Sequence, residues 1–254
     1  MINFNSKIFI AGHKGMLGSS ILRRFKKKGY KRLITIDKKK LDLRNQNSVI
    51  NFFKMKKPDV VIIAAAKVGG IKANIKYPAN FINDNFLIQT NLILNSYNHN
   101  VKKLILFGSS CVYPKGLKKP IKENQIMTGV LEKTNESYGV AKIAGIKMIE
   151  ALNKQFNTNY TCLMPCNLFG PNDNYDSEKS HFLPALIKKI YMASKKKRNK
   201  VVKLWGTGKP LREVLHVDQV ANACEYFLRK KTNKSLINIG SHVEMTIKDY
   251  ANLI

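Results

Sequence analysis

A glycine-rich turn joins the first apolar run of the chain to its first amphipathic helix. The stretch reads Lys7-Ile8-Phe9-Ile10-Ala11-Gly12-His13-Lys14-Gly15-Met16-Leu17-Gly18-Ser19. A strand, a Gly-x-x-Gly-x-x-Gly turn and a helix form the context of a dinucleotide fingerprint, because glycines let the backbone approach a pyrophosphate at the helix N-terminus. We therefore predict that the cofactor-binding turn consists of Gly12, His13, Lys14, Gly15, Met16, Leu17 and Gly18.

Apolar runs and helical patterns alternate through the first two thirds of the chain. Strands are expected at residues 7–11, 33–37, 60–64, 103–107 and 161–164, and helices at about residues 16–28, 48–54, 80–98 and 138–156. The runs are continuously apolar, which is typical of strands buried on both faces of a parallel sheet. We predict an α/β fold with a doubly wound parallel sheet of the Rossmann type, and residues 1–166 as the NADP-binding Rossmann domain.

The pattern changes at about residue 167, where turns and short elements begin. We expect a loop at 167–173, a helix at 181–194, short strands near 202–204 and 213–215, a helix capped by Asp218, a strand at 237–240 and a helix opened by Thr246. Residues 167–254 are predicted to form a smaller substrate-binding portion, interleaved with the Rossmann domain. The last helix stops at Ile254 with its apolar face unfinished, so we expect a C-terminally truncated portion.

Tyr138 and Lys142 lie four residues apart and therefore share one face of a helix. There the ammonium group would stabilise a phenolate and lower the tyrosine pKa from about 10, so that the phenol could exchange a proton with a sugar or alcohol oxygen. Ser109 follows the fourth apolar run and would supply a second hydrogen bond to that oxygen. A Tyr-x-x-x-Lys pair alone is common, and the position of Ser109 is what makes this one specific.

Cys111 and His181 are open to two interpretations each. Cys111 lies two residues beyond Ser109 and is a possible further acid or base, but a lone cysteine is usually a small buried apolar residue. His181 is the first residue of a predicted helix, and its position alone favours a structural role at the helix start.

The end of the second strand gives conflicting signals about the cofactor. Asp37 stands where an acid usually bonds to the ribose 2′-hydroxyl of NAD. Lys38-Lys39-Lys40 follows at once and could instead hold a 2′-phosphate. Simple exposure is an equally good interpretation of these lysines.

Length and composition indicate a soluble protein with a sizeable core. The chain has 254 residues, 44% of them hydrophobic, and its longest apolar run, residues 60–66, is far shorter than the ~20 residues of a membrane span. The first residues lack the order of a signal peptide. The four cysteines show no metal-ligand spacing, so we expect reduced thiols and no metal. The short apolar runs and the missing signal peptide predict no membrane association and a cytoplasmic location.

The formal net charge of +29 is carried mostly by lysines that are scattered through every segment. One interpretation of this charge is nucleic-acid binding. The lysine clusters fall at predicted helix ends and loops, and they lack interleaved aromatic residues for base stacking. We therefore expect no specific nucleic-acid site, although the positive field would help to attract an anionic nucleotide.

Several longer blocks are similar to those of the GDP-L-fucose synthases, the 3,5-epimerase/4-reductases of the extended short-chain dehydrogenase/reductase family. The blocks span residues 12–19, 64–71, 108–114, 138–145 and 164–171, and residues 180–186, 204–208 and 212–218 extend them. Ala-Ala-Lys-Val-Gly-Gly-Ile at 65–71 and Ser109-Ser110-Cys111 discriminate best, because relatives in the wider family lack them. The resemblance covers residues 7–254.

The resemblance implies epimerisation of GDP-4-keto-6-deoxy-D-mannose at C3 and C5, followed by NADPH-dependent reduction at C4. The implied reductase triad is Ser109, Tyr138 and Lys142, and the implied epimerisation base and acid are Cys111 and His181. Further implied cofactor contacts are Gly108, Ser109, Lys142, Pro165, Asn167, Leu168 and His181. The implied contacts to the GDP-sugar substrate are Lys189, Trp205 and Arg212.

The chain departs from the family pattern at Lys189, where the family has Arg, and at Cys166, where it has Thr. Lysine keeps the charge but loses bidentate binding of a diphosphate. NADPH is the implied cofactor, with NAD left possible by Asp37, and the family forms homodimers through the helices at 80–98 and 138–156. The alternatives are another NAD(P)-dependent nucleotide-sugar epimerase or dehydratase, and a cofactor-sensing protein that binds nucleic acid.

Overall fold

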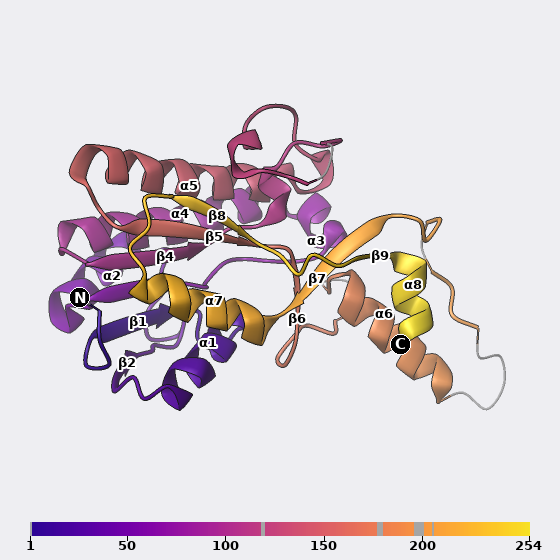
Figure 1. The fold of residues 1–254 in the computed structure, drawn as a ribbon, viewed down its shortest axis with the longest axis horizontal. Helices are drawn as coiled ribbons and strands as arrows, with labels where there is room; N and C mark the ends of the chain where they lie inside the picture. The colour runs from indigo at the N-terminus through magenta and orange to yellow at the C-terminus, as the bar shows by residue number, and fades with distance from the viewer. Residues whose placement is uncertain (1, 118–119, 177–179, 196–200, 205) are drawn as a thin grey trace.

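The longer apolar runs form one parallel sheet (Figure 1). The computed structural model describes residues 2–117, 120–176, 180–195, 201–204 and 206–254. The strands lie in the order β2-β1-β3-β4-β5-β8, and all neighbours pair in parallel. Their bounds are Lys7–Ala11 (β1), Arg32–Ile34 (β2), Val60–Ile63 (β3), Lys103–Phe107 (β4), Tyr160–Pro165 (β5) and Leu236–Ile239 (β8). The prediction of a doubly wound α/β fold is confirmed.

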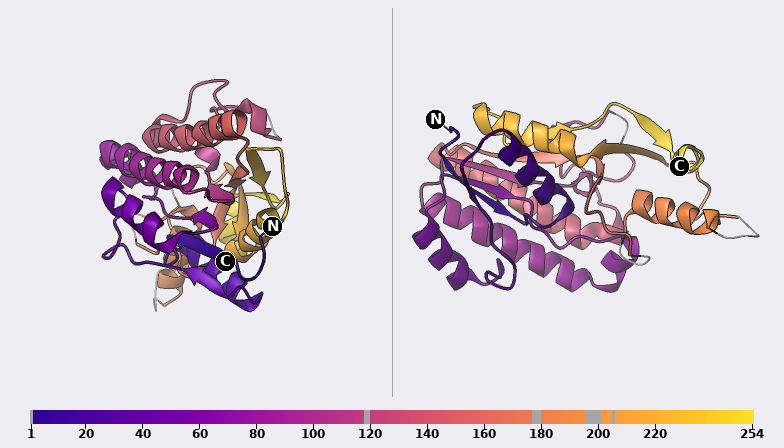
Figure 2. Two further views of the ribbon diagram at one scale, coloured as in Figure 1. Left: turned by 90° about the vertical axis from the view of Figure 1, so that its left-hand side faces the viewer. Right: turned by 90° about the horizontal axis from the view of Figure 1, so that it is seen from below.

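Helices cover both faces of this sheet, as the two views of Figure 2 show. Side chains alternate across β1: Phe9 packs with Phe52 and Phe53 on one face, whereas Ile8 and Ile10 pack on the other. The strands are therefore buried on both sides, which explains their continuous apolar runs. The first face carries α2 (Gln46–Lys56), α4 (Pro78–Asn98) and α5 (Glu136–Phe156), and the second carries α1 (Met16–Lys27) and α7 (Val217–Arg229).

The chain changes direction across the sheet between β1 and β3. β1 pairs on one side with β2, which follows it in sequence, and on the other side with β3. Loops that leave the carboxyl ends of the strands diverge at such a switch point, and ligands of open parallel sheets bind in the resulting crevice. The glycine-rich turn follows β1 and the loop of residues 64–70 follows β3, so both lie at this crevice.

A smaller lobe extends from the carboxyl edge of the sheet, to the right in Figure 1. Its strands have the order β6-β7-β9, with bounds Asn167–Phe169 (β6), Leu211–His216 (β7) and Glu244–Thr246 (β9). Helices α6 (Phe182–Ser194) and α8 (Ile247–Leu253) pack together through Leu183, Leu186 and Tyr250. Because α7 and β8 return to the large lobe, residues 167–254 contribute to both lobes.

Several expectations for the second half of the chain are wrong. Residues 167–169, expected as loop, form β6 because they pair with residues 214–216 of β7. Residues 202–204, which are described, form no strand, and β9 was not predicted. α7 begins at Val217 with His216 rather than Asp218 at its N-cap. Short strands depend on a partner distant in sequence, so local pattern is a weak guide to them.

In the first half of the chain, the structure differs from the prediction mainly in the connections between the main strands and helices. α3 (Ile71–Lys76) and the 3-10 turns η1 (Ser110–Val112), η2 (Glu123–Gln125) and η3 (Lys133–Asn135) were not predicted. β2 ends at Ile34, so Asp37 lies beyond the strand that it was expected to end.

Candidate functional site

Glycine is needed at two positions of the turn after β1. Gly12 has a φ of +87°, and a Cβ there would lie 2.6 Å from the amide nitrogen of Ala65. A Cβ on Gly18 would overlap the carbonyl group of Gly12. The turn can therefore approach both the 64–70 loop and α1 only because these side chains are absent.

α1 begins at this turn with an end suited to an anion. Gly15 is its N-cap and supplies no side-chain cap, and its first turn contains no acidic residue. The amide groups and the helix dipole favour negative charge there. The turn and the helix end thus fit the pyrophosphate of a dinucleotide.

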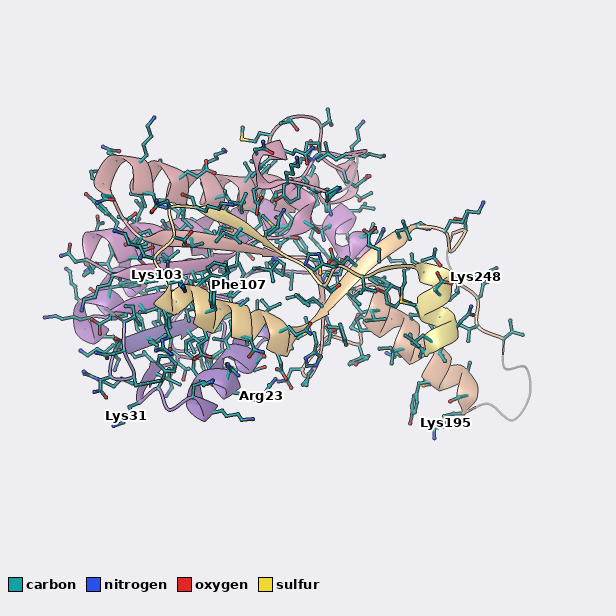
Figure 3. The ribbon with its side chains drawn as sticks, in the orientation of Figure 1. Arg23, Lys31, Lys103, Phe107, Lys195 and Lys248 are labelled. Carbon is teal, nitrogen blue, oxygen red and sulfur yellow. The ribbon has the colours of Figure 1, made fainter. Side chains whose placement is uncertain are left out.

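A pocket of about 270 Å³ lies beside the start of α1, at the carboxyl ends of the central strands. In Figure 3, Phe107 marks the end of β4 at the pocket and Lys103 marks the opposite end. The predicted site residues in the lining are Gly15, Met16, Leu17, Ser109, Tyr138, Lys142, Asn167, Leu168 and His181. Gly108 and Pro165 adjoin the lining residues Ser109 and Cys166 in the chain.

Tyr138 and Lys142 lie one turn apart on α5, as the spacing predicts. Lys142 is only 2% exposed, and its ammonium group donates a hydrogen bond to the Phe107 carbonyl oxygen at 2.9 Å. It lies 5.7 Å from the centre of the Tyr138 ring. Burial lowers the pKa of Lys142 to about 8, so the side chain remains charged at pH 7.

The expected lowering of the Tyr138 pKa is not found. Burial raises this pKa, negative charge at Cys111 would raise it further, and a hydrogen bond with Ser109 acts in the opposite direction. Desolvation is the largest of these effects, and the Lys142 ammonium group, which donates to the Phe107 carbonyl, is not among the causes of the shift. Tyr138 is therefore a protonated phenol at neutral pH.

Cys111 lies in η1, between the pocket-lining Ser110 and the buried Val112. Burial raises the pKa of its thiol, whereas a hydrogen bond with Ser109 and the charge of Lys142 lower it. The positive neighbour that a thiolate base requires is thus present, although desolvation is the larger effect.

His181 is the N-cap residue of α6 and lines the pocket from the smaller lobe. Partial desolvation lowers the pKa of its imidazole, and the Asp173 carboxylate raises it. Burial raises the pKa of Asp173, and His181 lowers it. The analysis of the sequence missed Asp173, because nothing in the spacing of these residues predicts that the loop brings them together.

A second pocket, of about 440 Å³, lies on the other side of the glycine-rich turn and includes Gly12. It shares Gly15, Ala64, Ala66 and Val68 with the first pocket. The two pockets therefore adjoin along the 64–70 loop and cross the switch point, which is the extended shape that a dinucleotide requires.

Asp37 is engaged by two residues of the glycine-rich turn. Its carboxylate lies 2.8 Å from the Lys14 ammonium group and 3.4 Å from the His13 ring, and the bond to Lys14 lowers its pKa. Asp37 does not line the second pocket, whereas Lys38 does. The conflict between the two sequence signals is thus decided locally, because Lys14 neutralises the acid and Lys38 adds positive charge to the pocket.

A charged network that the sequence analysis missed also lines the second pocket. Arg44 contacts Asp42 at 2.6 Å and Asp84 at 3.1 Å, and Asp84 contacts Lys67 at 3.0 Å. The hydrogen bond from Arg44 lowers the pKa of Asp42 to about 2. Asn85 holds the backbone of Lys67 by accepting from its N–H and donating to its carbonyl, each at 2.9 Å. The signal that could have revealed the network is an arginine two residues after an acid in a chain rich in lysine.

The residues expected to contact the substrate belong to the smaller lobe. Lys189 on α6 donates to the Lys203 carbonyl at 3.4 Å, and Arg212 on β7 donates to the Leu211 carbonyl at 2.8 Å. Neither side chain lines the first pocket. Trp205 lies outside the residues that the structure describes.

The described part of the chain offers no candidate membrane span and no candidate metal site. None of its helices is long and apolar enough to cross a membrane. None of its groups of His, Cys, Asp and Glu has the arrangement of a metal site. Its four cysteines carry free thiols.

Comparison with known proteins identifies the class to which this fold and site belong. The model of the NAD dependent epimerase/dehydratase family matches residues 8–240, and the chain belongs to this family. Within it, the chain is 48% identical to the putative GDP-L-fucose synthase 2 of Arabidopsis thaliana. That match covers the whole chain and 77% of the plant protein.

Two solved structures have the same fold. MlghC, a GDP-mannoheptose C4 reductase from Campylobacter jejuni with NADP bound, has a TM-score of 0.91 at 36% identity, over 100% of this chain and 85% of that one. A GDP-L-fucose synthetase from Naegleria fowleri bound to NADP has a TM-score of 0.89 at 29% identity, over 99% of this chain and 77% of that one.

Proposed function

We propose that this chain catalyses the GDP-L-fucose synthase reaction: epimerisation of GDP-4-keto-6-deoxy-D-mannose at C3 and C5, then NADPH-dependent reduction at C4. The observation that carries the proposal is that His181, Ser109, Tyr138 and Lys142 line one pocket, and that Cys111 lies beside it, hydrogen-bonded with Ser109 and influenced by the charge of Lys142. A reductase alone needs only the last three residues. A thiol and an imidazole in addition suit proton transfer at carbon. The identity to a putative GDP-L-fucose synthase supports the same conclusion.

Epimerisation begins with the acidity that the C4 ketone confers on the hydrogens of C3 and C5. Cys111, as thiolate, removes a proton, and Ser109 and Tyr138 hydrogen-bond to the enolate oxygen that forms. His181 returns a proton from the opposite face and inverts the centre. The thiol and the imidazole then exchange protons with solvent, so each inversion leaves a solvent-derived hydrogen on carbon.

Reduction at C4 uses the phenol as a proton donor. The raised pKa of Tyr138 keeps its proton in place until the ketone oxygen gains negative charge. Lys142 is charged at pH 7 and stabilises the phenolate that remains. Ser109 keeps the oxygen within reach of the phenol.

NADPH fits the two adjoining pockets better than NADH. The turn of residues 12–18 and the start of α1 would hold the pyrophosphate. Lys38 and Arg44 line the second pocket, and their positive charges would bind the 2′-phosphate that distinguishes NADPH from NADH. Bound in this way, the cofactor supplies the hydride for C4. Asp37 would influence the cofactor only through its ion pair with Lys14. The remaining contacts to the cofactor are proposed for Gly108, Pro165, Asn167 and Leu168. The two structural relatives with bound NADP support this choice.

The GDP-sugar is proposed to lie between the two lobes. Residues 1–166 would bind the cofactor and residues 167–254 most of the substrate, with Lys189, Trp205 and Arg212 at the diphosphate and the base. Both described side chains of this set are positively charged, which suits a diphosphate.

We further propose a cytoplasmic homodimer. Phe86, Leu87 and Leu94 form an exposed apolar stripe on α4, beside the partly exposed face of α5. An apolar stripe on two long adjacent helices suits a four-helix interface with a second copy. The free thiols suit a reducing compartment.

The proposal is tested with the keto-sugar in deuterated water, followed by NMR at C3 and C5 and by NADPH absorbance. We expect wild-type protein to exchange both hydrogens and to oxidise NADPH. Cys111→Ser should lower exchange by about 10²-fold or more, the usual size of a general-base contribution, while NADPH affinity stays within about two-fold.

Cys224→Ser is the matched control, because Cys224 is buried on α7 outside the pocket. It should retain exchange. A Cys111→Ser protein that still exchanges both hydrogens contradicts the role of the thiol.

A second candidate function is C4 reduction of a GDP-sugar without epimerisation, and the likeness to MlghC favours it. In that case wild-type protein oxidises NADPH but incorporates no deuterium. Tightly retained NAD⁺ in the purified protein would instead indicate a 4-epimerase or dehydratase of the same family.

A further inference from the structure

η1, the short turn that carries Cys111, is attached differently at its two ends. Its first end continues from β4, where Gly108 N–H donates to the Leu163 carbonyl at 2.9 Å, so Ser109 follows directly from the sheet. Within the turn, the N–H groups of Val112 and Tyr113 donate to Ser109 and Ser110 at 3.2 Å. One turn of 3-10 helix is held weakly by its own bonds. The position of Cys111 therefore depends on what holds the far end.

Tyr113 holds the far end of η1 to the edge of the sheet. Its side chain is only 7% exposed and packs in the core under α5. Its hydroxyl group donates to the side-chain oxygen of Asn238, 125 residues away, at 2.5 Å. Burial raises the pKa of Tyr113 to about 12, so the phenol remains a donor throughout the pH range of an ordinary assay.

Asn238 is itself fixed on β8, the edge strand. Its side-chain NH₂ donates to the Ile121 carbonyl at 3.1 Å, and its backbone N–H donates to the Glu123 carboxylate at 3.0 Å. The bond to Ile121 orients the amide group, so that its oxygen is turned to Tyr113. Tyr113, Ile121 and Glu123 are thus all bound to Asn238 at the free edge of β8.

η1 has little room to move, because its backbone packs closely against α5. A Cβ on Gly139 would lie 3.0 Å from the carbonyl oxygen of Cys111, so the backbone of the turn rests directly on α5. Gly139 directly follows Tyr138, and Lys142 is on the same helix. A tilt of η1 would therefore change the place of the Cys111 thiol relative to both residues, while Ser109 stays with β4.

We propose that Tyr113, held by Asn238, is a positioning residue for Cys111 and serves the epimerisation step more than the hydride step. The inference rests on the proposed function, because it assigns proton abstraction at carbon to Cys111. Tyr138 and Lys142 are carried by α5, and Ser109 follows β4 before η1 begins, so none of the three depends on this bond. The two halves of the reaction should therefore respond differently when the bond is removed.

The test measures the two half-reactions separately in Tyr113→Phe. Epimerisation is followed as deuterium incorporation at C3 and C5 of the keto-sugar, and the hydride step as NADP⁺-dependent oxidation of GDP-L-fucose. We expect exchange to fall about ten-fold, since small misplacements of a reacting group cost this much or more. Product oxidation should stay within about two-fold of wild type.

Tyr160→Phe is the matched control. Tyr160 is also buried and donates to a backbone carbonyl, that of Val101, at 3.2 Å, but it lies at the opposite end of β5 from the pocket. Its removal should destabilise the fold to a similar degree without separating the half-reactions. A similar loss of exchange in Tyr160→Phe would overturn the inference.

Two substitutions at Asn238 keep the test decisive if Tyr113→Phe folds poorly. Asn238→Asp retains an acceptor for Tyr113 but loses the bond to Ile121, so exchange should fall less than in Asn238→Ala, which should reproduce the loss. The double variant Tyr113→Phe/Asn238→Ala should be no slower in exchange than either single variant, because both remove the same bond.

An equal fall of both half-reactions in Tyr113→Phe, or no fall in exchange, refutes the positioning role. Wild-type protein that does not exchange the hydrogens at C3 and C5 refutes the proposed function itself, whether or not it oxidises the product. The two failures are therefore distinguishable.

Discussion

Desolvation governs the protonation states of the site residues. Burial raises the pKa of Tyr138 and of Cys111 and lowers that of Lys142 to about 8, so each group moves toward its neutral form. Of these three groups, Lys142 has the pKa closest to neutral pH. Its charge is therefore the first of the three to change as the pH rises from 7.

We predict an alkaline limb near pH 8 in NADPH oxidation by the keto-sugar. Lys142 is protonated below its pKa of about 8 and loses its charge as the pH rises through that value. The phenolate that Tyr138 forms on giving up its proton, and the thiolate at Cys111, then lose their stabilising cation, so kcat/KM should decline. The profile is measured in buffers of constant ionic strength.

Lys142→Arg identifies the group behind this limb, because a guanidinium group stays charged throughout the range. The variant should have lower activity and no limb near pH 8. Lys147→Arg, on the exposed side of the same helix, should keep the wild-type profile. A limb that persists unchanged in Lys142→Arg assigns it to another group.

At the scale of single elements, the two ends of β4 have different roles: one end supplies residues to the pocket, and the other affects the stability of the fold. Its carboxyl end brings Phe107 and then Ser109 to the pocket, whereas its first residue, Lys103, is buried at the opposite edge (Figure 3). The Lys103 ammonium group donates to Asn159 at 2.8 Å and to Thr161 at 3.3 Å, without a carboxylate among these partners. Burial lowers its pKa to about 8.

We predict that Lys103→Met removes part of the pH dependence of stability. The folded-state pKa lies below the unfolded value, so the cost of the buried charge is fully present below pH 8 and is relieved between pH 8 and about 10.5. The unfolding free energy of wild type should therefore rise across this window relative to Lys103→Met, by at most about 3 kcal/mol. Urea unfolding at several pH values measures the difference.

Lys102→Met is the control for this comparison. Lys102 is exposed and pairs with Asp59 at 3.0 Å, so its replacement should leave the pH dependence in this window close to that of wild type. Parallel curves for wild type and Lys103→Met would contradict the prediction.

The paired helices α4 and α5 lead to a prediction about assembly. Leu94 is 38% exposed on the apolar stripe of α4. Leu94→Glu would place a charge in the proposed interface between two copies, so we expect a shift from dimer to monomer in light scattering. Met55→Glu, on the exposed side of α2, should leave the mass unchanged. A wild-type monomer would refute the dimer directly.

For the whole molecule, the charge of +29 is distributed over both lobes. Figure 3 shows Arg23 and Lys31 on the large lobe and Lys195 and Lys248 on the smaller one, at the periphery in each case. A charge of this size repels itself and attracts anions over a distance set by the salt concentration. Both NADPH and the GDP-sugar carry diphosphates.

We predict that kcat/KM for NADPH falls as salt is added while kcat changes little. Screening removes the long-range attraction, so a decline of about ten-fold is expected between ~20 and ~300 mM KCl. Steady-state rates at saturating keto-sugar measure it. A parallel decline in kcat would point to damage to the site instead of lost attraction.

The predictable part of the molecule follows from local periodicity. The parallel sheet follows from apolar runs such as 60–66, and the pairing of Tyr138 with Lys142 follows from helical spacing, which needs no knowledge of distant residues. β6 and β9 were missed because they exist only through pairing with β7. Periodicity within so short a segment carries too little information to reveal a partner.

The sequence alone therefore determined the α/β class, the turn of residues 12–18 and the approach of Ser109, Tyr138 and Lys142 to one edge of a sheet. Only the tertiary structure decided their protonation, because desolvation depends on every atom around a group. It also decided that Lys14 neutralises Asp37 and that Tyr113 meets Asn238 from 125 residues away. Contacts of this kind result from packing between elements, and local spacing does not encode them.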